Sequence, residues 1–453
     1  MQGGDTRDTI AALATPPGRG GVAVIRVSGP AVPAIARAVL GHLPQPRLGR
    51  FAAFRDADGS TIDRGLALYF AAPSSFTGEH VLELQGHGSP MLCDLLLARL
   101  LALGARLARP GEFSERAFLN DKLSLAQAEA IADAIDAGSH AAARAAMRSL
   151  QGRFANQVSA LAEALVQLRV YTEAAIDFPD EEVDFLGDGE VQARLEALQQ
   201  QLRQLQADAE RGARLRDGLT VVLAGAPNVG KSSLLNCLAA RDSAIVTAVA
   251  GTTRDVLREQ IDVDGLPLHV VDTAGLRETH DPVEAEGVRR ARAELQRADR
   301  ILLLFDDSQG LQAADRRLLE ELEKTELPVT LVANKIDLSG RAPGAGRLGG
   351  RELVKLSATS GAGMQALIAQ LKHSAGLEAA ATPDFIARRR HLDALQRAAM
   401  ALQRGHEQLV MAQAGELLAE ELRLAHRALG EITGEFTSED LLGAIFSSFC
   451  IGK

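Results

Sequence analysis

A glycine-rich segment that ends in a lysine offers the clearest chemistry in this sequence. Residues 220–224 form an apolar, β-branched run typical of a buried strand, and Gly225-Ala-Pro-Asn-Val-Gly230-Lys231-Ser232 follows directly. A loop of this kind, placed between a strand and a helix, turns its backbone N–H groups toward phosphate oxygens. The lysine can reach the β- and γ-phosphates, and the serine hydroxyl can bind a magnesium ion. We therefore expect a bound nucleoside triphosphate, with a chance glycine-rich loop as the alternative.

Further segments predict which nucleotide is bound. An apolar strand ends in Asp272-Thr-Ala-Gly275, whose aspartate can hold a magnesium-bound water and whose glycine N–H can meet the γ-phosphate. Another strand runs into Asn334-Lys335-Ile-Asp337, and a carboxylate there fits two adjacent donors that guanine has and adenine lacks. A last strand leads to Ser357-Ala358, a loop of the type that covers the guanine carbonyl. In this order after a phosphate loop, the segments predict GTP.

The position after Asp-x-x-Gly departs from the Ras-like pattern. A glutamine there positions the attacking water in Ras-like GTPases, whereas Leu276 cannot. Glu284, in the segment that follows, could take this role, although a solvated carboxylate at a helix start is an equal alternative. Thr252 or Thr253 could give a hydroxyl to magnesium when the γ-phosphate orders its loop. Asn228 supplies an amide oxygen beside the phosphates and could bind a second, monovalent cation.

Length and charge limit the classes of protein that fit. A chain of 453 residues with 46% hydrophobic composition predicts a few domains with ordinary cores. Its 49 basic and 59 acidic residues give a net charge of −10, so no global positive field draws it onto nucleic acid. Contact with RNA would need a local patch such as residues 388–391, for which a solvated helix face is the favoured alternative.

Cysteine use and the chain ends predict a soluble, cytoplasmic protein. Cys93, Cys237 and Cys450 are too few and too scattered for a disulfide framework or a zinc site. The first residues lack an apolar signal region, and no run of about 18 apolar residues could span a membrane. The last five residues, Phe-Cys-Ile-Gly-Lys, superficially fit a prenylation box, but their glycine and final lysine exclude it.

The elements that must position these motifs fall into successive zones. Residues 1–121 alternate strand and helix signals and predict a small α+β domain. From 122 to 217 the composition becomes helical, and residues 218–376 form the GTP module, in which the Gly- and Arg-rich stretch 341–351 is expected to be a loop. Helical composition resumes over 377–453. The expected fold is multidomain α/β plus α, with a discontinuous helical bundle and an inserted Ras-like P-loop GTPase domain.

Four leucines recur at a regular spacing in the helical zone. They recur as in a heptad and predict the core of a helix bundle, with a dimer seam as the less favoured alternative. These residues are Leu195, Leu198, Leu202 and Leu205.

Taken together, the segments resemble the MnmE (TrmE) family of tRNA-modification GTPases. The resemblance covers essentially the full length, and no motif position departs from the family. It rests on Thr15-Pro-Pro-Gly-Arg-Gly-Gly21, Ser75-Phe-Thr-Gly-Glu79, Leu84-Gln-Gly-His-Gly88, Arg109-Pro-Gly-Glu-Phe-Ser-Glu-Arg-Ala-Phe-Leu-Asn120, Gly251-Thr-Thr-Arg-Asp255, Asp272-Thr-Ala-Gly-Leu-Arg277 and Phe449-Cys-Ile-Gly-Lys453.

The resemblance implies a potassium-stimulated, homodimeric GTPase that works with the flavoprotein partner MnmG as a heterotetramer. Together they would modify C5 of the wobble uridine, position 34, of certain tRNAs with a carboxymethylaminomethyl- or aminomethyl-type group. A tetrahydrofolate derivative, 5-formyl- or 5,10-methylene-tetrahydrofolate, would supply the one-carbon unit to the N-terminal domain, which also forms the dimer. The implied folate-contacting positions are Arg26, Glu83, Lys122 and Lys453.

The resemblance also implies how GTP is hydrolysed. Two GTP domains of the dimer would close on each other around a potassium ion, which replaces an arginine finger. Glu284 would orient the attacking water through a second water, and Cys450 would be needed for tRNA modification but not for hydrolysis. The implied potassium ligands are Asn228, Thr252 and the carbonyls of Thr247 and Val249, and the implied magnesium ligands are Ser232 and Thr253.

The full set of positions expected at the nucleotide combines the motifs and the resemblance, with Lys231 as a catalytic cation. The set is Asn228, Val229, Gly230, Lys231, Ser232, Ser233, Thr247, Ala248, Val249, Ala250, Gly251, Thr252, Thr253, Asp272, Thr273, Ala274, Gly275, Asn334, Lys335, Asp337, Ser357 and Ala358.

Two other classes of protein are alternatives. A ribosome-assembly GTPase would carry a basic RNA-binding appendage, which neither the net charge of −10 nor the N-terminal zone supports. A folate-dependent enzyme with a degenerate nucleotide domain would have lost the chemistry of Lys231, Asp272 and Asp337, all of which are present.

Overall fold

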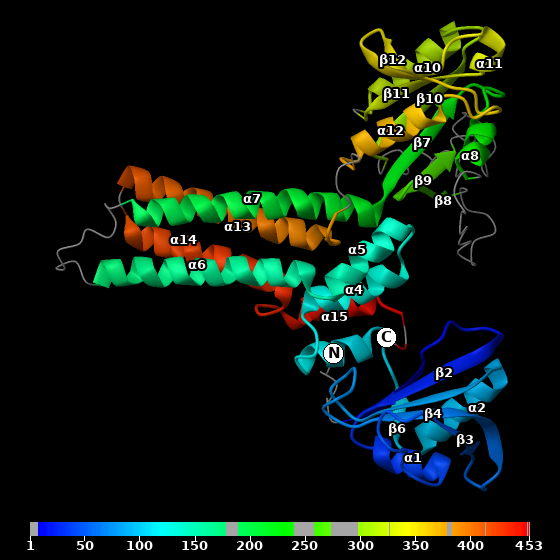
Figure 1. Ribbon diagram of the computed structural model, residues 1–453, viewed down its shortest axis with the longest axis vertical. Coiled ribbons are helices and arrows are strands. Elements are labelled where there is room, and N and C mark those ends of the chain that lie inside the picture. The colour runs from blue at the N-terminus through cyan, green and yellow to red at the C-terminus, as the bar shows by residue number, and fades with distance from the viewer. Residues whose placement is uncertain are drawn as a thin grey trace. The chain divides into compact units, whose positions relative to one another are not determined.

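The computed structural model describes residues 8–177, 189–239, 258–272, 298–325, 327–377, 383–412, 414–450 and 452 (Figure 1). The chain divides into two compact units. The first contains Met1–Ala132, Leu150–Gln199 and Arg397–Lys453, and the second contains Asp133–Ser149 and Gln200–Gln396. Each unit is therefore discontinuous in sequence. The predicted four-part division into domains stays a prediction.

The N-terminal part of the first unit is built on a six-stranded sheet of order β3-β4-β5-β2-β1-β6. Its elements are β1 (Thr9–Leu13), β2 (Gly20–Ser28), α1 (Val32–Leu40), β3 (Arg50–Arg55), β4 (Thr61–Phe70), β5 (Val81–Gly88), α2 (Pro90–Ala102), β6 (Ala105–Leu107) and α3 (Glu112–Leu119). Side chains alternate between the faces of a strand, so Ile25 and Leu82 pack on α1 and α2. Ile10 faces the opposite side and packs on Phe113 of α3. This is the small α+β domain predicted from the sequence.

The rest of the first unit is helical. Its elements are α4 (Leu125–Ile135), α6 (Arg153–Asp177), α7 (Glu190–Asp217), α13 (Arg389–Ala412), α14 (Gly415–Thr433) and α15 (Glu439–Ser447), of which α4, α7 and α13 continue into the second unit. Helices α6 and α14 lie side by side (Figure 1). The four spaced leucines of α7 are at most 6% exposed within this one chain. Their burial confirms a bundle core and not a dimer seam.

The second unit contains a seven-stranded sheet of order β12-β13-β11-β10-β7-β9-β8. Its elements are α5 (His140–Leu150), β7 (Leu219–Gly225), α8 (Lys231–Ala239), β8 (Arg258–Val263), β9 (Leu266–Asp272), β10 (Arg300–Asp306), α10 (Ala313–Glu323), β11 (Val329–Asn334), α11 (Ile336–Ser339), β12 (Gly344–Leu348), β13 (Arg351–Lys355) and α12 (Met364–Ser374). The inner strands are parallel, and β8 and β12 run antiparallel to them. Helices α8 and α12 pack on one face and α10 on the other. Both faces are thus covered, as in the expected α/β GTPase domain.

Two expectations about local structure were wrong. The stretch 341–351 contains an edge strand, β12, which pairs with β13 in a hairpin. Almost every residue of β12 is exposed, so the strand lacks the alternation of apolar and polar residues that would have predicted it. The cluster 388–391 is not a solvated helix face either, because His391 is buried and Arg388 binds Asp133. Within the described ranges, every helix is too short or too polar to cross a lipid bilayer.

Candidate functional site

The phosphate loop is shaped by residues with unusual backbone angles. Gly225 has φ +144° where β7 ends, and a Cβ there would lie 2.4 Å from the carbonyl oxygen of Leu304. Gly230 has φ +99°, and a Cβ there would lie 2.3 Å from Nδ2 of Asn334. Only glycine fits either position. Asn228 has φ +61°, a left-handed angle that asparagine tolerates better than most residues, and its side chain is exposed.

The helix that follows directs its N-terminus at this loop. α8 begins at Lys231, and the next two residues, Ser232 and Ser233, are exposed in its first turn. The Lys231 Nζ donates to the carbonyl oxygens of Gly225 and Ala226, at 2.9 and 3.1 Å. The ammonium group is therefore held over the loop beside a helix N-terminus that carries a partial positive charge. This donor set fits an anion with several oxygens, such as a polyphosphate.

Asn334 joins the phosphate loop to the loop expected over guanine. Its Nδ2 donates to the carbonyl oxygen of Val229 at 2.8 Å, and its Oδ1 accepts from the N–H of Ala358 at 3.0 Å. Asn334 is only 2% exposed and Ser357 is buried. The amide thus fixes two expected nucleotide contacts to the end of β11.

The other two expected residues of the base-recognition segment, Lys335 and Asp337, are placed differently. Lys335 has φ +65°, and its Nζ lies 2.8 Å from Oδ2 of Asp306. Burial raises the pKa of Asp306, but hydrogen bonds from Lys335 and Ser308 outweigh it and hold that pKa below its usual range. Asp337 is exposed on the short helix α11, so its carboxylate is open to a ligand.

Strand β9 brings the magnesium motif next to the phosphate loop. β9 runs parallel to β7, and its last residue, Asp272, is in register with Leu223, shortly before Gly225. The backbone of Asp272 is described, but its side chain is not. The other expected positions of the switch segments lie outside the described residues; they are Thr247, Ala248, Val249, Ala250, Gly251, Thr252, Thr253, Thr273, Ala274, Gly275 and Glu284.

A second polar site lies on the N-terminal sheet. Arg26 of β2 and Glu83 of β5 are directly opposite each other in the antiparallel ladder. The Arg26 Nε donates to Glu83 Oε1 at 2.9 Å, and both side chains are partly buried. The guanidinium carbon lies 5.7 and 5.8 Å from the ring centroids of Phe113 and Phe76, within the range of cation–π attraction. Among the described residues, Oε2 of Glu83 has no hydrogen-bond partner.

The C-terminal tail reaches this second site. The carbonyl oxygen of Gly452 accepts from Arg26 Nη1 at 3.3 Å. Gly452 has φ +94°, and a Cβ there would lie 2.5 Å from the carbonyl oxygen of Leu13, so only glycine fits this close approach. Cys450 has an exposed side chain, and its carbonyl oxygen accepts from the N–H of Gly111 at 3.3 Å. Lys453 lies outside the described residues.

Lys122 lies beside the loop that also carries Phe76. Its side chain is exposed, and its Cε would lie 3.2 Å from a Cβ on Gly78. The adjacent Asn120 donates to the carbonyl oxygen of Thr77 at 2.7 Å. The structure therefore brings Arg26, Glu83 and the residue before Lys453 together, and places Lys122 beside Gly78 in the loop that carries Phe76.

Comparisons with known proteins show the family of this chain. A model described as the MnmE helical domain matches residues 125–450, and one described as the N-terminus of GTP-binding protein TrmE matches residues 9–122. A protein of Yersinia pseudotuberculosis serotype IB (strain PB1/+) named tRNA modification GTPase MnmE is 58% identical over 99% of this chain and 100% of its own length. The chain belongs to the MnmE family. A member from Pectobacterium atrosepticum is 57% identical over 98% of this chain and 99% of its own.

Solved structures of other GTP-binding proteins show more limited similarity to this MnmE family member. A variant of Era from Aquifex aeolicus bound to GDP and aluminium fluoride is 28% identical, with a TM-score of 0.28, over 40% of this chain and 66% of that one. The G domain of the FeoB iron transporter of T. maritima is 24% identical, with a TM-score of 0.26, over 35% of this chain and 98% of that one.

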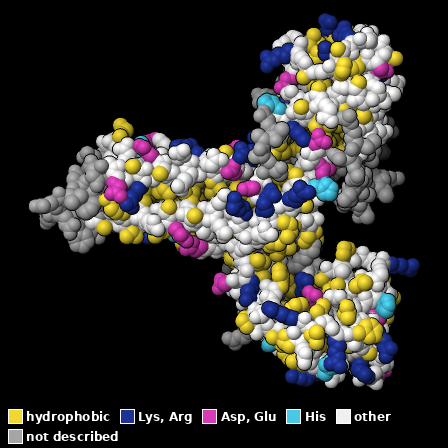
Figure 2. All heavy atoms as spheres, in the orientation of Figure 1, with side chains coloured by type: hydrophobic (Ala, Val, Ile, Leu, Met, Phe, Trp, Pro, Cys, Tyr) yellow, Lys and Arg dark blue, Asp and Glu magenta, His cyan; other side chains and the backbone are white. Residues whose placement is uncertain are grey.

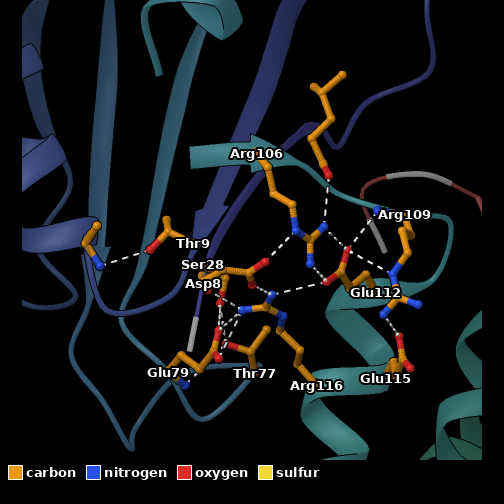
Figure 3. Close-up of polar contacts among 12 residues, drawn as sticks. Asp8, Thr9, Ser28, Thr77, Glu79, Arg106, Arg109, Glu112, Glu115 and Arg116 are labelled. Carbon is orange, nitrogen blue, oxygen red and sulfur yellow. Dashed lines mark hydrogen bonds and ion pairs between the residues drawn. The ribbon is translucent and has the colours of Figure 1, made fainter. Parts of the chain in front are cut away.

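A buried ion-pair network supports the second site of this MnmE family member, and the sequence did not predict it (Figure 3). Arg116 of α3 donates to both carboxylate oxygens of Glu79 at 3.1 Å and to Glu112 at 3.1 Å. Glu79 also accepts from the Ser28 hydroxyl at 2.7 Å. Asp8 binds both Arg106 and Arg116. The network ties α3 to β2 and to the loop that holds Phe76.

The network favours the charged form of Glu112. Burial raises the pKa of Glu112, but hydrogen bonds from Arg106, the Arg109 N–H and Arg116 outweigh it and lower that pKa to about 2. Arg116 and Glu112 are 4% and 2% exposed. The spacing of these two residues on α3 was the one available signal, because residues four apart on a helix are neighbours.

Proposed function

We propose that this MnmE family member is a potassium-stimulated GTPase that modifies tRNA together with the flavoprotein MnmG. The modification would add a carboxymethylaminomethyl- or aminomethyl-type group to C5 of the wobble uridine, position 34, of certain tRNAs. A tetrahydrofolate derivative would supply the one-carbon unit when bound at the N-terminal domain. We expect the reaction in the cytoplasm, in a heterotetramer of two copies of each protein.

The contact between Arg26 and the carbonyl oxygen of Gly452 carries the proposal. It brings the segment with Cys450 onto the sheet that holds Glu83, so an exposed thiol and a polar site for a flat ring belong to one domain. Glu83 Oε2 can accept from an amino group, and Arg26 can donate to a carbonyl oxygen or a carboxylate. Phe76, 38% exposed, offers an apolar ring beside them. These residues fit the amino edge and the ring of a pterin, and Lys122 and Lys453 would meet its charged tail.

The phosphate loop supports GTP with two kinds of cation. Lys231 and the N-terminus of α8 would bind the phosphates, and Ser232 and Thr253 would hold magnesium. Asn228 presents an exposed amide within the loop, and with Thr252 and the carbonyls of Thr247 and Val249 it would hold potassium. Oxygen ligands of this kind suit hard cations. Potassium would add positive charge where other GTPases use an arginine finger.

The N-terminal sheet also supports a homodimer. Hydrophobic side chains show over the surface of the N-terminal domain (Figure 2). Phe51, Val22 and Leu66 are 68%, 62% and 45% exposed. All three lie on strands β2, β3 and β4. Phe51 and Leu66 lie opposite each other on the paired strands β3 and β4. Exposed apolar side chains that lie together favour burial against a partner, and a second copy of this domain would provide it.

The decisive experiment measures the wobble uridine in cells. A strain that lacks its own MnmE, complemented with this chain, should regain modified uridine at position 34 by mass spectrometry of its tRNA. The purified chain should hydrolyse GTP at least about tenfold faster in potassium than in sodium chloride, and Asn228→Ala should remove this difference while nucleotide still binds. Unmodified tRNA in the complemented strain would overturn the proposed substrate, and equal rates in the two salts would overturn the potassium site.

A further inference from the structure

The hairpin formed by β8 and β9 lies between the two segments expected to respond to GTP. In sequence, β8 follows the expected switch residues 247–255, and β9 ends at Asp272 of the magnesium motif. The hairpin turns at Asp264 and Gly265, both of which have positive φ. Any movement of either neighbouring segment acts on the hairpin through the chain itself.

Helix α5 holds the tip of this hairpin. The His140 N–H, at the start of α5, donates to Asp262 Oδ2 at 3.3 Å, and Asp262 Oδ1 accepts from the Gly265 N–H at 2.7 Å. The Ser139 hydroxyl donates to the carbonyl oxygen of Gly265 at 3.0 Å. A Cβ on Gly265 would lie 3.2 Å from that of Ala141, so the contact is close.

The contact between Asp262 and α5 depends on the partial positive charge at the N-terminus of the helix. The first N–H groups of a helix lack partners within it and carry a partial positive charge. Asp262 places a carboxylate against one of them. Ser139, which is 6% exposed, also accepts from the Ala142 N–H at 3.1 Å and caps the helix. One carboxylate and one hydroxyl therefore bind the hairpin and α5 together.

The other end of α5 holds the chain where it leaves the GTPase domain. Ser149 Oγ accepts from the Ile386 N–H at 2.9 Å. Arg148 donates to the carbonyl oxygens of Pro383 and Asp384, at 2.7 and 2.9 Å. Alanines of α5 pack between Leu215, where the chain enters the domain, and Ile386, where it leaves. Small side chains allow α5 to approach both linkers closely.

Asp133, on the helix before α5, joins the same two linkers by charge. Its Oδ1 lies 2.8 Å from Arg216 Nε and 2.8 Å from Arg388 Nη2, and its side chain is 6% exposed. Burial lowers the pKa of Arg216, but the charge of Asp133 outweighs it and raises that pKa. Arg216 is the last but one residue of α7, and Arg388 directly precedes α13. Both helices continue into the helical part of the first unit, as does α4, which carries Asp133.

We propose that α5 couples the nucleotide site to the helical domain, with Asp262 as the positioning residue that transmits the state of the hairpin. Segment Asp133–Ser149 belongs to the same compact unit as the GTPase domain, although it precedes that domain in sequence. A shift of the hairpin tip moves the N-terminus of α5, and the C-terminus of this rigid helix then moves the exit linker. The contacts form a continuous physical chain from the hairpin through α5 to the exit linker. This inference rests on the proposed function, in which GTP hydrolysis drives tRNA modification.

Asp262→Asn tests the coupling with little change in shape. The amide oxygen still accepts from the Gly265 N–H and keeps the turn, but the amide nitrogen cannot accept from His140. Asp264→Asn is the matched control. It also removes a charge from this turn, but Asp264 pairs with Lys372 of α12. Ser139→Ala is a second variant that breaks the contact from the α5 side.

Hydrogen–deuterium exchange reports the coupling directly. In the parent chain, a non-hydrolysable GTP analogue should change exchange by at least about twofold both in the phosphate loop and in residues 140–150. Asp262→Asn and Ser139→Ala should keep the change in the phosphate loop and lose it in α5, and Asp264→Asn should keep both. A nucleotide-dependent change in α5 that survives in Asp262→Asn, or that is absent from the parent, would overturn the inference.

Activity provides the second readout. Asp262→Asn should hydrolyse GTP within about twofold of the parent while wobble modification in the complemented strain falls at least about tenfold. Normal wobble modification in both Asp262→Asn and Ser139→Ala would overturn the coupling. A parallel fall in hydrolysis, modification and melting temperature would assign Asp262 a structural role and overturn it as well. Failure of the parent chain itself to modify tRNA would instead count against the proposed function, so the two failures are distinguishable.

Discussion

The side-chain amide of Asn334 donates to the carbonyl oxygen of Val229 at 2.8 Å, and this bond fixes the phosphate loop to the base-recognition segment. The same amide accepts from the Ala358 N–H. One buried residue therefore holds two parts of the nucleotide site in register. Its role is structural support of the site, in addition to the contact with guanine expected from the sequence.

Asn334→Asp should weaken GTP binding by about 10- to 100-fold, because it replaces the donor facing Val229 with a second acceptor. Leaving a buried carbonyl oxygen unpaired costs about 1–3 kcal/mol, and here the cost falls on the bound conformation of the loop. Titration with a fluorescent GTP analogue measures the effect. Asn120→Ala, which removes a comparable amide hydrogen bond in the N-terminal domain, should leave GTP affinity unchanged. Parental affinity in Asn334→Asp would show that the loop holds its shape without this bond.

Asp337→Asn should exchange guanine preference for xanthine. The carboxylate of Asp337 is exposed and open to a ligand, and it accepts from two donors of guanine in the proposed complex. An amide offers a donor instead, which suits the carbonyl of xanthine. Discrimination of this kind reaches about 10⁴-fold when a misfit leaves polar groups unpaired. Competition between GTP and XTP for the purified variant is the measurement, and unchanged preference for GTP would make the assignment of Asp337 wrong.

Glu284→Ala should slow hydrolysis without weakening nucleotide binding. A residue that acts only in the transition state lowers kcat and leaves affinity nearly unchanged. Glu284 lies outside the described residues, so this prediction stands on the sequence and the family. Single-turnover hydrolysis, compared with binding of a fluorescent GTP analogue, separates the two effects. Normal turnover would redirect the search to Glu286 or Glu278 in the same segment.

Sequence patterns predicted those parts of the molecule that depend on local spacing. The strand before Gly225 and the buried leucines of α7 follow directly from the spacing of apolar residues. The elements missed have no such pattern. Strand β12 is an exposed edge strand, and its pairing with β13 holds it in the sheet.

Long-range pairing was the other feature that the sequence could not reveal. Arg116 and Glu79 are far apart in sequence, and so are Asp133 and Arg388. Each is one of many charged residues that would be solvated by default, and only the fold selects the partner. The quoted family segments did contain Glu79 and Arg116, but nothing in their spacing indicated that the two side chains meet.

The ion-pair network predicts a dependence of local stability on pH. Glu112 has its pKa lowered from 4.5 to about 2 in the folded chain. Its contribution is therefore fully present above pH 4.5 and is lost as the pH falls toward 2. The shift corresponds to about 3 kcal/mol at neutral pH. Glu112→Gln should lower the opening free energy of α3, measured by hydrogen exchange at residues 112–119, and the variant should lose the part of the acid dependence that Glu112 contributes.

Glu115 is the control of opposite sign. Burial raises the pKa of Glu115, with partial compensation from Arg109. The folded state therefore favours its protonated form, and its charge opposes folding at neutral pH. Glu115→Gln should leave the stability of α3 at pH 7 unchanged or increase it. Equal losses in the Glu112→Gln and Glu115→Gln variants would mean that side-chain packing, and not charge, determines the result.

Cys450→Ser should separate tRNA modification from GTP hydrolysis. The thiol of Cys450 is exposed, and its backbone is anchored to Gly111 beside the Arg26 site. Serine keeps the size of the side chain and removes thiolate chemistry. Potassium-stimulated hydrolysis should stay within about twofold of the parent, while the wobble uridine in complemented cells loses its modification. Cys93→Ala is the matched control, because burial raises the pKa of that thiol and makes it a poor nucleophile.

Gly452→Ala tests whether the tail must be seated for Cys450 to act. An alanine Cβ would lie 2.5 Å from the carbonyl oxygen of Leu13, so the tail must leave its place beside Arg26. Modification should fall as in Cys450→Ser although the thiol is intact, and binding of 5-formyl-tetrahydrofolate, measured by calorimetry, should weaken.

Full modification by Cys450→Ser would reduce the cysteine to a packing residue. Loss of hydrolysis in both variants would mean that the tail maintains the fold of the chain and takes no part in the reaction.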